Sequence, residues 1–239
     1  MQSKGYFFHN PDVKPENLDF IIFPFIEKVD EAIYNDGYFT ALRKNVLVFS
    51  GIRSAYLSEK CAEHDIKYHV MMDDNGIKVK NAVPTSEGVI AYLIHSLSCT
   101  IANSCILVIG YGVCGRDLSL RLTSLGAKVY ALVRNREKEC AACADSVMPI
   151  YLNELSRINF DAIINTVPKC VLTDEMLERT NGAILVDIAS KPYGFNMELA
   201  KKLNSKSALL PSLPGKYSPQ TAGEILGEYI DFILRGMTK

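Results

Sequence analysis

Three glycines at fixed spacing form the motif with the clearest chemistry in this chain. The segment Gly110-Tyr-Gly112-Val-Cys-Gly115 directly follows an apolar run, Cys105–Ile109, and precedes a helical pattern of leucines that ends near Gly126. In a strand–turn–helix unit the first glycine allows a tight turn, the second lets a pyrophosphate approach, and the third lets the helix pack against the strand. The helix N-terminus offers N–H groups and partial positive charge to phosphates. The motif predicts a dinucleotide site; the alternative is a plain tight turn.

The end of the next predicted strand indicates which dinucleotide is preferred. That strand, Val129–Val133, is followed by Arg134-Asn135-Arg136 and not by the Asp or Glu that binds the ribose of NAD. The first carboxylate is Glu137, which the pattern places in the following helix. Because a guanidinium binds a phosphate through two charge-assisted hydrogen bonds, the sequence favours NADP over NAD. Two solvated charges at a strand end are the alternative.

The rest of the chain predicts an α/β fold, a Rossmann-type doubly wound parallel sheet with a smaller N-terminal α/β lobe. Apolar runs typical of buried parallel strands alternate with helical patterns. The expected strands are Phe20–Phe23, Val46–Phe49, Tyr68–Met72, Cys105–Ile109, Val129–Val133, Asp161–Asn165, Ala183–Ser190 and Ala208–Leu210. Helices are expected near 30–42, 54–63, 85–98 and 173–179, and from Pro219 onwards with Ser218 as the cap.

These elements divide into three expected parts. Residues 1–98 form a small substrate-side lobe that ends in a linking helix at 84–98. Residues 99–217 form the NADP-binding domain, and residues 218–239 form a C-terminal helix that crosses back to the first lobe. The segment Asp73-Asp-Asn-Gly76 is expected to be a turn. Ligands in such folds lie beyond the carboxyl ends of the strands, so the loops there are expected to carry the chemistry.

Composition excludes several classes of function. The 26 basic and 27 acidic residues give a net charge of −1, so no general attraction to nucleic acid or membrane is expected. The apolar run Phe20–Ile26 is broken by Pro24 and is too short to span a bilayer, and Met1–Asn10 lacks the order of a signal peptide. The 7 cysteines are expected to be reduced and mostly buried, with Cys140-Ala-Ala-Cys143 in a core-facing helix and no metal site.

Several loop segments, taken as a set, resemble one family. They are Asn81–Gly88 (NAVPTSEG), Ile164–Pro168 (INTVP), Asp187–Pro192 (DIASKP) and Leu213–Gly223 (LPGKYSPQTAG), with Phe49–Ile52 and Ala55–Leu57 as an N-terminal match. Together they are similar to the A subunit of dipicolinate synthase, over roughly Phe20 to Leu234. Rossmann neighbours such as hydroxyacid dehydrogenases share the glycine turn.

The resemblance implies a cytoplasmic enzyme in the mother cell of a spore-forming bacterium. It would work with a flavoprotein-like second subunit, use NADP, and oxidise a (hydroxy-)hydrodipicolinate to pyridine-2,6-dicarboxylate; self-association is also expected. Family members begin with a further strand–helix portion of about 50 residues, so the first lobe of this chain is expected to be reduced. Two alternatives stay open: a shortened, non-catalytic NADP-binding or scaffold subunit, and another NAD(P)-dependent oxidoreductase of the same fold.

Cations in the loops are the candidates for holding a dianionic substrate. Lys191 follows the strand beside the expected nicotinamide position and is a candidate for carboxylate binding or proton transfer, with a surface lysine as the alternative. Lys216, in the Pro214-Gly215 loop, and Arg53 are further candidates. Thr85 and Glu87 are expected at the start of the linking helix, where capping is the simpler role and general-base catalysis by Glu87 the other.

The remaining candidates are hydroxyl groups and residues that line the cofactor. Ser50, Ser190 and Thr221 are expected at loops or helix starts that face the substrate. Residues expected against the cofactor beyond the three glycines and two arginines are Val113, Cys114, Asn135, Thr166, Val167, Pro168, Ala189, Pro214 and Gly215. The histidines, His9, His64, His69 and His95, all precede the glycine turn. A D-2-hydroxyacid dehydrogenase carries its acid–base histidine after that turn, so the sequence argues against that chemistry.

Overall fold

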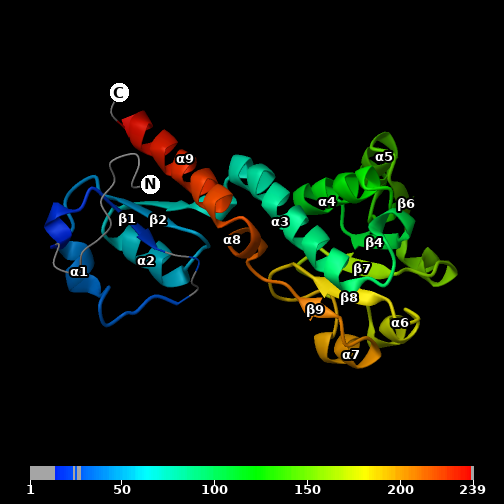
Figure 1. Ribbon diagram of the computed structural model, residues 1–239. Coiled ribbons are helices and arrows are strands. Elements are labelled where there is room, and N and C mark those ends of the chain that lie inside the picture. Colours follow the sequence, from blue (N-terminus) through cyan, green and yellow to red (C-terminus); the bar gives the residue numbers. More distant parts are fainter. Residues whose placement is uncertain (1–13, 24, 26–27, 238–239) are drawn as a thin grey trace. The chain divides into compact units, whose positions relative to one another are not determined.

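The computed structural model describes residues 14–23, 25 and 28–237, and these form two compact units (Figure 1). The smaller unit combines Met1–Lys78 with Gly223–Lys239, and the larger unit is contiguous from Val79 to Ala222. Each unit has its own parallel sheet, which confirms the predicted α/β class. Among the helices of the described residues, none is both long enough and apolar enough to cross a membrane.

The larger unit contains a six-stranded sheet in the order β6-β5-β4-β7-β8-β9. Its strands are β4 (Cys105–Ile109), β5 (Lys128–Leu132), β6 (Met148–Ile150), β7 (Ala162–Asn165), β8 (Ile184–Asp187) and β9 (Ala208–Leu209). The chain runs outward from β4 to β6, then returns to add β7 on the other side of β4. This reversal makes the carboxyl end of β4 the topological switch point, where ligands bind in doubly wound sheets.

Helices cover both faces of this sheet (Figure 1). One face is covered by α4 (Val113–Ser124), α5 (Arg136–Ala144) and the later turns of α3 (Asn75–Ser96), and the other by α6 (Asp174–Glu178) and α7 (Met197–Leu203). Along β4, Ile106 and Val108 belong to the first core and Leu107 and Ile109 to the second. Because both faces are buried, the strand reads as a continuous apolar run.

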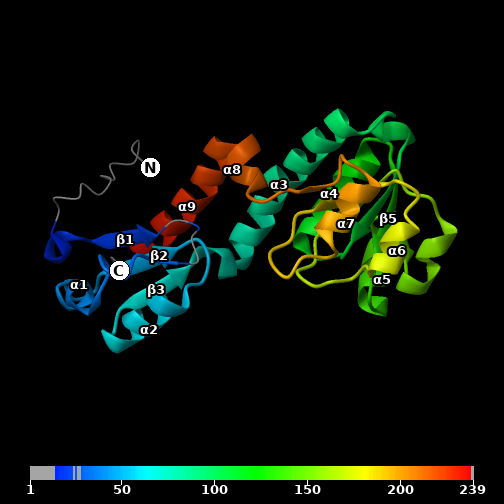
Figure 2. The same cartoon turned by 90° about the horizontal axis from the view of Figure 1, so that it is seen from below.

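The smaller unit contains a three-stranded parallel sheet in the order β1-β2-β3. The strands are β1 (Phe20–Phe23), β2 (Leu47–Ser50) and β3 (Lys67–Val70). Helices α1 (Asp36–Thr40) and α2 (Ala55–Glu63) pack on one face, and α9 (Pro219–Met237) packs on the other (Figure 2). Val48 points to the core under α1 and α2. Leu47 and Phe49 point to the core on the opposite face, which includes Ile225 and Ile230 of α9.

Helix α3 begins at Asn75, about three turns before the predicted start. The Asp74 carboxylate accepts a hydrogen bond from the Ile77 N–H (2.9 Å), as an N-cap side chain does, so the predicted turn at Asp73–Gly76 leads directly into the helix. Pro84 lies inside α3. A proline has no N–H to donate to the preceding turn, yet α3 runs through this position, and the predicted start near residue 85 is wrong.

Two other segments differ from expectation. The helix predicted near 30–42 is limited to α1, whose N-cap is Asn35. The predicted Pro214-Gly215 loop is a short helix, α8 (Leu213–Tyr217). Ser212 before it takes a left-handed conformation (φ 58°), and Leu213 is buried where a Cβ on Gly88 of α3 would lie 2.9 Å from its Cδ2. Leu213 therefore packs closely against a glycine of α3, and this contact anchors α8 to that helix.

The prediction of mostly buried cysteines is wrong. Cys61 is buried, Cys105 and Cys114 are half-buried, and Cys99, Cys140, Cys143 and Cys170 are exposed. Helix α5 buries Ala142 at its core face, so the two cysteines of this helix point to solvent.

Candidate functional site

The three glycines of the turn after β4 serve three different structural ends. Gly110 has φ +95°, and a Cβ there would lie 2.4 Å from Val167 Cγ2. A Cβ on Gly115 would lie 2.2 Å from the Gly110 carbonyl oxygen, so the close approach of α4 to the turn requires glycine. Gly112 is the N-cap of α4, has no side-chain cap, and has nothing within 4 Å of the place where a Cβ would stand. The turn thus combines a left-handed backbone conformation at Gly110, a close helix contact at Gly115 and an open backbone position at Gly112.

Tyr111 anchors this turn to the end of α5. Its buried side chain donates a hydrogen bond from the hydroxyl to Asp145 Oδ2 (2.8 Å). Arg116 of α4 binds both oxygens of the same carboxylate, through Nε (2.6 Å) and Nη2 (2.9 Å). The Arg116 hydrogen bonds hold the pKa of Asp145 below its ordinary value, and burial raises the pKa of the Tyr111 hydroxyl. The carboxylate therefore stays charged and ties together the turn, α4 and α5.

The segment after β7 packs directly on the glycine turn. The Thr166 hydroxyl donates to the carbonyl oxygen of Ile109 (2.8 Å), the last residue of β4. The same Oγ1 would lie 2.9 Å from a Cβ on Gly110 and 3.0 Å from one on Gly115. Thr166 and Val167, both predicted to line the cofactor, are thus adjacent to the turn; Pro168 follows them and is exposed.

A buried asparagine–aspartate pair, absent from the residues predicted above, shapes the loops after β7 and β8. Asn165 Nδ2 donates to Asp187 Oδ1 (3.0 Å), and both side chains are fully buried. The Asp187 carboxylate also accepts the N–H groups of Ala189 (2.9 Å) and Gly194 (2.7 Å), closing the loop that carries Ser190 and Lys191. The sequence could have indicated this pair, because a polar residue stands at the last position of each of two otherwise apolar strands.

The segment after β5 presents two arginines to solvent. Arg134 and Arg136 are exposed, and neither has an ion-pair partner within the described part of the chain. Asn135, predicted to contact the cofactor, is the N-cap of α5, because its Oδ1 accepts the Lys138 N–H (3.0 Å). Glu137 pairs with the Lys138 ammonium (3.2 Å) in the first turn of α5. The first two charged residues after the strand are thus arginines, and the first carboxylate is that of Glu137 in α5.

The glycine turn and the uncapped start of α4 fit a nicotinamide dinucleotide, and proteins of known sequence and structure share this fold. No protein-family model matches the chain. The A subunit of dipicolinate synthase from Bacillus subtilis (strain 168) is 29% identical over 208 residues, which are 86% of this chain and 70% of that protein. The crystal structure of this Bacillus subtilis protein gives a TM-score of 0.86 at 27% identity, over 95% of this chain and 81% of that one.

This chain is a relative of the dipicolinate synthase A protein. The crystal structure of the same protein from Bacillus halodurans agrees, with a TM-score of 0.87 at 26% identity, over 95% of this chain and 83% of that one. The resemblance inferred from the loop segments is therefore confirmed.

Two more distant proteins share parts of this architecture. S-inosyl-L-homocysteine hydrolase of Methanocaldococcus jannaschii is 29% identical over 145 residues, which are 59% of this chain and 34% of that protein. A transhydrogenase from Sinorhizobium meliloti has a TM-score of 0.68 at 13% identity, over 93% of this chain and 75% of that one, and it shows the fold alone. Together the matches support an NAD(P)-linked, oxidoreductase type of protein.

The candidates on α3 lie away from the glycine turn of this dipicolinate synthase relative. Thr85 is inside the helix, not at its start, and its hydroxyl donates to the Asn81 carbonyl oxygen (2.7 Å), so it is not a cap. Glu87 lies 3.8 Å from Arg121 Nη1. Because Arg121 is about two and a half turns beyond Gly112 along α4, this ion pair is far from the turn. The capping roles predicted for Thr85 and Glu87 are therefore wrong.

The remaining candidates are distributed over other elements. Pro214, Gly215 and Lys216 belong to α8, and Thr221 lies in the first turn of α9. Ser50 and Arg53 belong to the smaller unit. The Ser50 hydroxyl is buried and bonded to the Ile52 carbonyl oxygen (2.7 Å) and to the Tyr68 hydroxyl (2.6 Å), while Arg53 pairs with Asp73.

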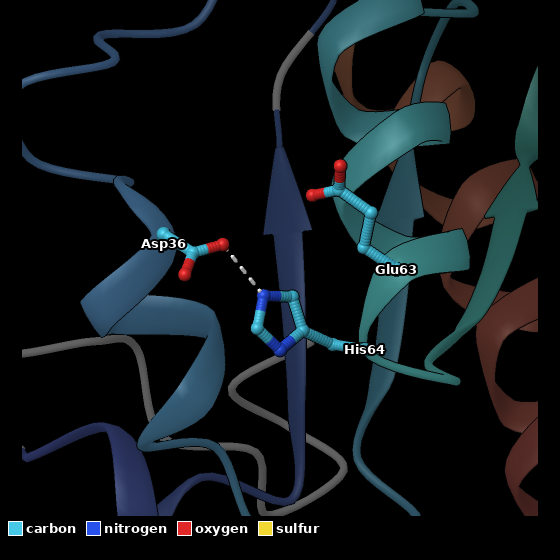
Figure 3. Close-up of side chains that lie close together, drawn as sticks. All are labelled: Asp36, Glu63 and His64. Carbon is cyan, nitrogen blue, oxygen red and sulfur yellow. Dashed lines mark hydrogen bonds and ion pairs between the residues drawn. The ribbon is translucent and has the colours of Figure 1, made fainter.

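The described histidines lie in the smaller unit or on α3. His64 Nε2 lies 2.9 Å from Asp36 Oδ1, with Glu63 close by (Figure 3). The three side chains offer ligand atoms within 4.8 Å of one another. The Lys60 ammonium, however, bonds both Glu63 (2.6 Å) and Asp36 (3.2 Å), and so supplies the positive charge that a metal would bring. His69 stacks on Phe49, and burial lowers its pKa. His9 and the segment Met1–Asn10 lie outside the described residues.

Proposed function

We propose that this chain is an NADP-dependent oxidoreductase subunit that oxidises a (hydroxy-)hydrodipicolinate to dipicolinate. The observation that carries the proposal is the turn Gly110–Gly115, whose open position at Gly112 begins an uncapped helix at the switch point of the sheet. Uncapped N–H groups at a helix start bind phosphate oxygens. The likeness to dipicolinate synthase supports the substrate.

The preference for NADP over NAD rests on Arg134 and Arg136. Both are exposed at the end of β5 and lack ion-pair partners among the described residues. A 2′-phosphate at this place would receive charge-assisted hydrogen bonds, each about 1.5–3 kcal/mol. The N–H groups of Val113, Cys114 and Gly115 bind the pyrophosphate, while Thr166, Val167, Pro168 and Ala189 line the nicotinamide half. Burial raises the pKa of the Cys114 thiol, so it acts by its backbone and not as a thiolate.

The substrate side of the proposed site is the loop after β8. Oxidation removes a hydride, which the nicotinamide accepts, and a proton, and a hydroxylated substrate also loses one water to reach the aromatic ring. Lys191 and Ser190 are exposed on the loop that Asp187 closes. Both are proposed to contact the substrate, and Lys191 is the candidate for holding its carboxylate or for proton transfer. Arg53, Ser50, Thr221 and Lys216 remain further proposed contacts. Because Glu87 pairs with Arg121, we rank it and Thr85 last as catalytic groups.

The proposal also covers partners and place. The matched protein is one subunit of a synthase, and we propose that this chain likewise works with a second, flavoprotein-like subunit. We further propose self-association and a place in the cytoplasm of the mother cell during sporulation. Nucleic acid and membrane are not proposed as partners, in keeping with a net charge of −1.

Cofactor choice is tested by Arg134→Asp. The variant should bind NADPH about 10- to 100-fold more weakly, because a cation becomes an anion beside the 2′-phosphate, and should bind NADH as before. The matched control is Arg157→Asp, an exposed arginine of the same unit that lies after β6. Equal losses for NADPH and NADH in fluorescence titrations would refute the assignment to NADP.

Turnover is tested with enzymatically made hydroxytetrahydrodipicolinate and NADP, with and without the second subunit. Appearance of the pyridine absorbance in the ultraviolet supports the synthase reaction. Binding of NADPH without turnover, in the presence of the partner, favours the non-catalytic role instead. Turnover of another substrate would favour a different oxidoreductase of this fold.

A further inference from the structure

Strands β7 and β8 end in the same kind of turn, side by side. The two strands pair in register, with Asn165 opposite Asp187. The Val167 N–H donates to Asn165 Oδ1 (3.1 Å), and the Ala189 N–H donates to Asp187 Oδ1 (2.9 Å). In both cases the side chain bonds the backbone two residues on, which is an Asx turn. The two loops therefore leave neighbouring strands in matching conformations.

The two turns are joined into one rigid unit. Asn165 Nδ2 donates to Asp187 Oδ1 (3.0 Å) and to the Val167 carbonyl oxygen (2.9 Å), and Asp187 Oδ2 accepts the Gly194 N–H (2.7 Å). Space around the pair is filled, because a Cβ on Gly194 would lie 2.3 Å from Asn165 Cγ. A buried polar pair with its hydrogen bonds made holds its surroundings in one arrangement. The relative position of the two loops is thus fixed by these two side chains.

Each loop carries a lysine four residues after its Asx residue. They are Lys169, after Asn165, and Lys191, after Asp187. Both are exposed, and neither has a carboxylate partner within the described part of the chain. Neighbouring strands lie about 4.8 Å apart, so the structure holds two unpaired positive charges on adjacent loops. Such charges repel each other unless an anion lies between them.

We propose that Lys169 is a second carboxylate-binding residue of the site, and that the Asn165–Asp187 pair positions it beside Lys191. The inference rests on the proposed function and adds to it the way in which a dianion is recognised. A pyridine ring with carboxylates at positions 2 and 6 presents two separated negative charges, one for each lysine. Lys169 is a binding residue, whereas Asn165 and Asp187 act only through the loops that they hold.

The test compares a dicarboxylate with a monocarboxylate. Pyridine-2,6-dicarboxylate and pyridine-2-carboxylate are titrated calorimetrically into the full chain saturated with NADP. Lys169→Ala should lower the affinity for the dicarboxylate about 10-fold and that for the monocarboxylate much less, because one charge-assisted contact is removed. The matched control is Lys201→Ala, an exposed lysine of α7 in the same unit, which should change neither affinity.

The positioning role is tested by Asp187→Asn. An amide has one acceptor oxygen in place of two, so the N–H of Ala189 or of Gly194 loses its acceptor. The loop should then shift and the preference for the dicarboxylate should fall, while NADPH still binds. A merely structural role would lower both affinities equally. If Asp187→Asn fails to fold, Lys169→Ala still decides the proposal, because that residue is exposed.

A double variant checks that the pair acts through the lysine. In the Lys169→Ala background, Asp187→Asn should lower the remaining preference for the dicarboxylate less than it does in the unaltered chain, because one of the two positioned charges is already gone. Fully additive losses would overturn the positioning role of Asp187.

The outcomes separate this inference from the proposed function. If Lys169→Ala behaves like Lys201→Ala, or lowers the affinity for NADPH and not that for the dicarboxylate, the inference is overturned and the oxidoreductase proposal stands. If the unaltered chain binds NADPH but no dicarboxylate, the inference and the proposed substrate fall together. If NADPH does not bind at all, the proposed function fails at its cofactor, and dicarboxylate binding measured without cofactor still decides the role of Lys169.

Discussion

The turns after β2 and after β4 are built from similar elements, but only the turn after β2 has a side chain that caps the helix it leads into. Each follows a buried parallel strand, contains a glycine, and leads into a helix. After β2, Ser54 caps α2 by accepting the Leu57 N–H, and the Tyr68 hydroxyl accepts the Ser54 N–H (3.2 Å). After β4, the cap of α4 is Gly112, which has no side chain to offer. The first turn caps its helix with its own side chain, whereas the second leaves the start of α4 without a side-chain cap.

Space around the glycines differs in the same way. A Cβ on Gly51 would lie 2.5 Å from the Phe25 ring, so a side chain of the same unit already fills that place. At Gly112 nothing lies within 4 Å of the corresponding position. The comparison teaches that a glycine in a strand–helix turn does not by itself indicate a ligand site. What distinguishes the turn after β4, the proposed ligand site, is backbone that is both open and without a side-chain cap.

The largest effect is expected for Gly115→Ala. The new Cβ would lie 2.2 Å from a backbone oxygen, so the turn or α4 must shift. We expect the free energy of unfolding of the larger unit to fall by roughly 1–3 kcal/mol, with loss of NADPH binding, as measured by urea unfolding and fluorescence titration. The control is Gly223→Ala in α9, where a Cβ meets nothing within 4 Å and stability should not fall. Unchanged NADPH affinity in Gly115→Ala would break the comparison.

Gly112→Ala should separate binding from stability. Nothing obstructs its Cβ in the protein, so the free energy of unfolding should fall by no more than about 1 kcal/mol, which is the usual cost of alanine at an N-cap. The methyl group would, however, stand where a pyrophosphate approaches the backbone, and NADPH affinity should fall about 5- to 100-fold. Calorimetric titration measures the loss. Full affinity would mean that the open position is not the phosphate site.

Ser54→Ala is the matching change in the smaller unit. It removes the side-chain cap of α2 and should cost about 1 kcal/mol of unfolding free energy. NADPH affinity should stay the same, because this turn closes on itself through Ser50, Tyr68 and Ser54. Urea unfolding followed by circular dichroism, beside an NADPH titration, checks both points. A clear loss of NADPH affinity would show that the two turns are not as different as their contacts indicate.

The smallest effect concerns acid stability through Asp145. Its pKa lies below the ordinary value of 3.8, mainly because of the Arg116 hydrogen bonds. A carboxyl group whose pKa is lowered in the folded state stabilises the protein fully above its unfolded pKa, and this stabilisation is lost as the pH falls through the folded value. Asp145→Asn should therefore flatten the loss of stability below about pH 4. The free energy of unfolding is measured at pH 3 and pH 6 for the unaltered chain and for Asp145→Asn, with Glu137→Gln as the exposed control. The same loss of stability in Asp145→Asn and in the unaltered chain would contradict the role of Asp145.

Local patterns were sufficient to predict the glycine turn and most strands along the chain, because both depend on residues close in sequence; the edge strand β6 (Met148–Ile150) was not predicted. The run Cys105–Ile109, the three glycines and Gly126 together specify a strand, a turn and a helix. The exposed pair Arg134 and Arg136 was also recognisable from its place after a strand. Whether these residues hold NADP stays a prediction, which the variants above test.

Features set by distant partners could not be predicted in the same way. Leu213 of α8 packs against Gly88 of α3. Glu87 of α3 lies 3.8 Å from Arg121, which belongs to another helix. The link between Asn165 and Asp187 depends on the register of two strands. Pro84 gave a misleading signal, because the rule against proline in helices was outweighed by the packing of α3 on the sheet.

The discontinuous make-up of the smaller unit has a consequence for its biosynthesis. One face of its sheet is covered by Ile225 and Ile230 of α9, which are translated after the whole of the larger unit. Until α9 has been made and has left the ribosome, Leu47 and Phe49 lack that cover, whereas most of the larger unit precedes α9 and is released first. A chain that ends just before Gly223 should therefore still bind nucleotide through its larger unit but aggregate more readily than the full chain, because one face of the smaller sheet stays uncovered.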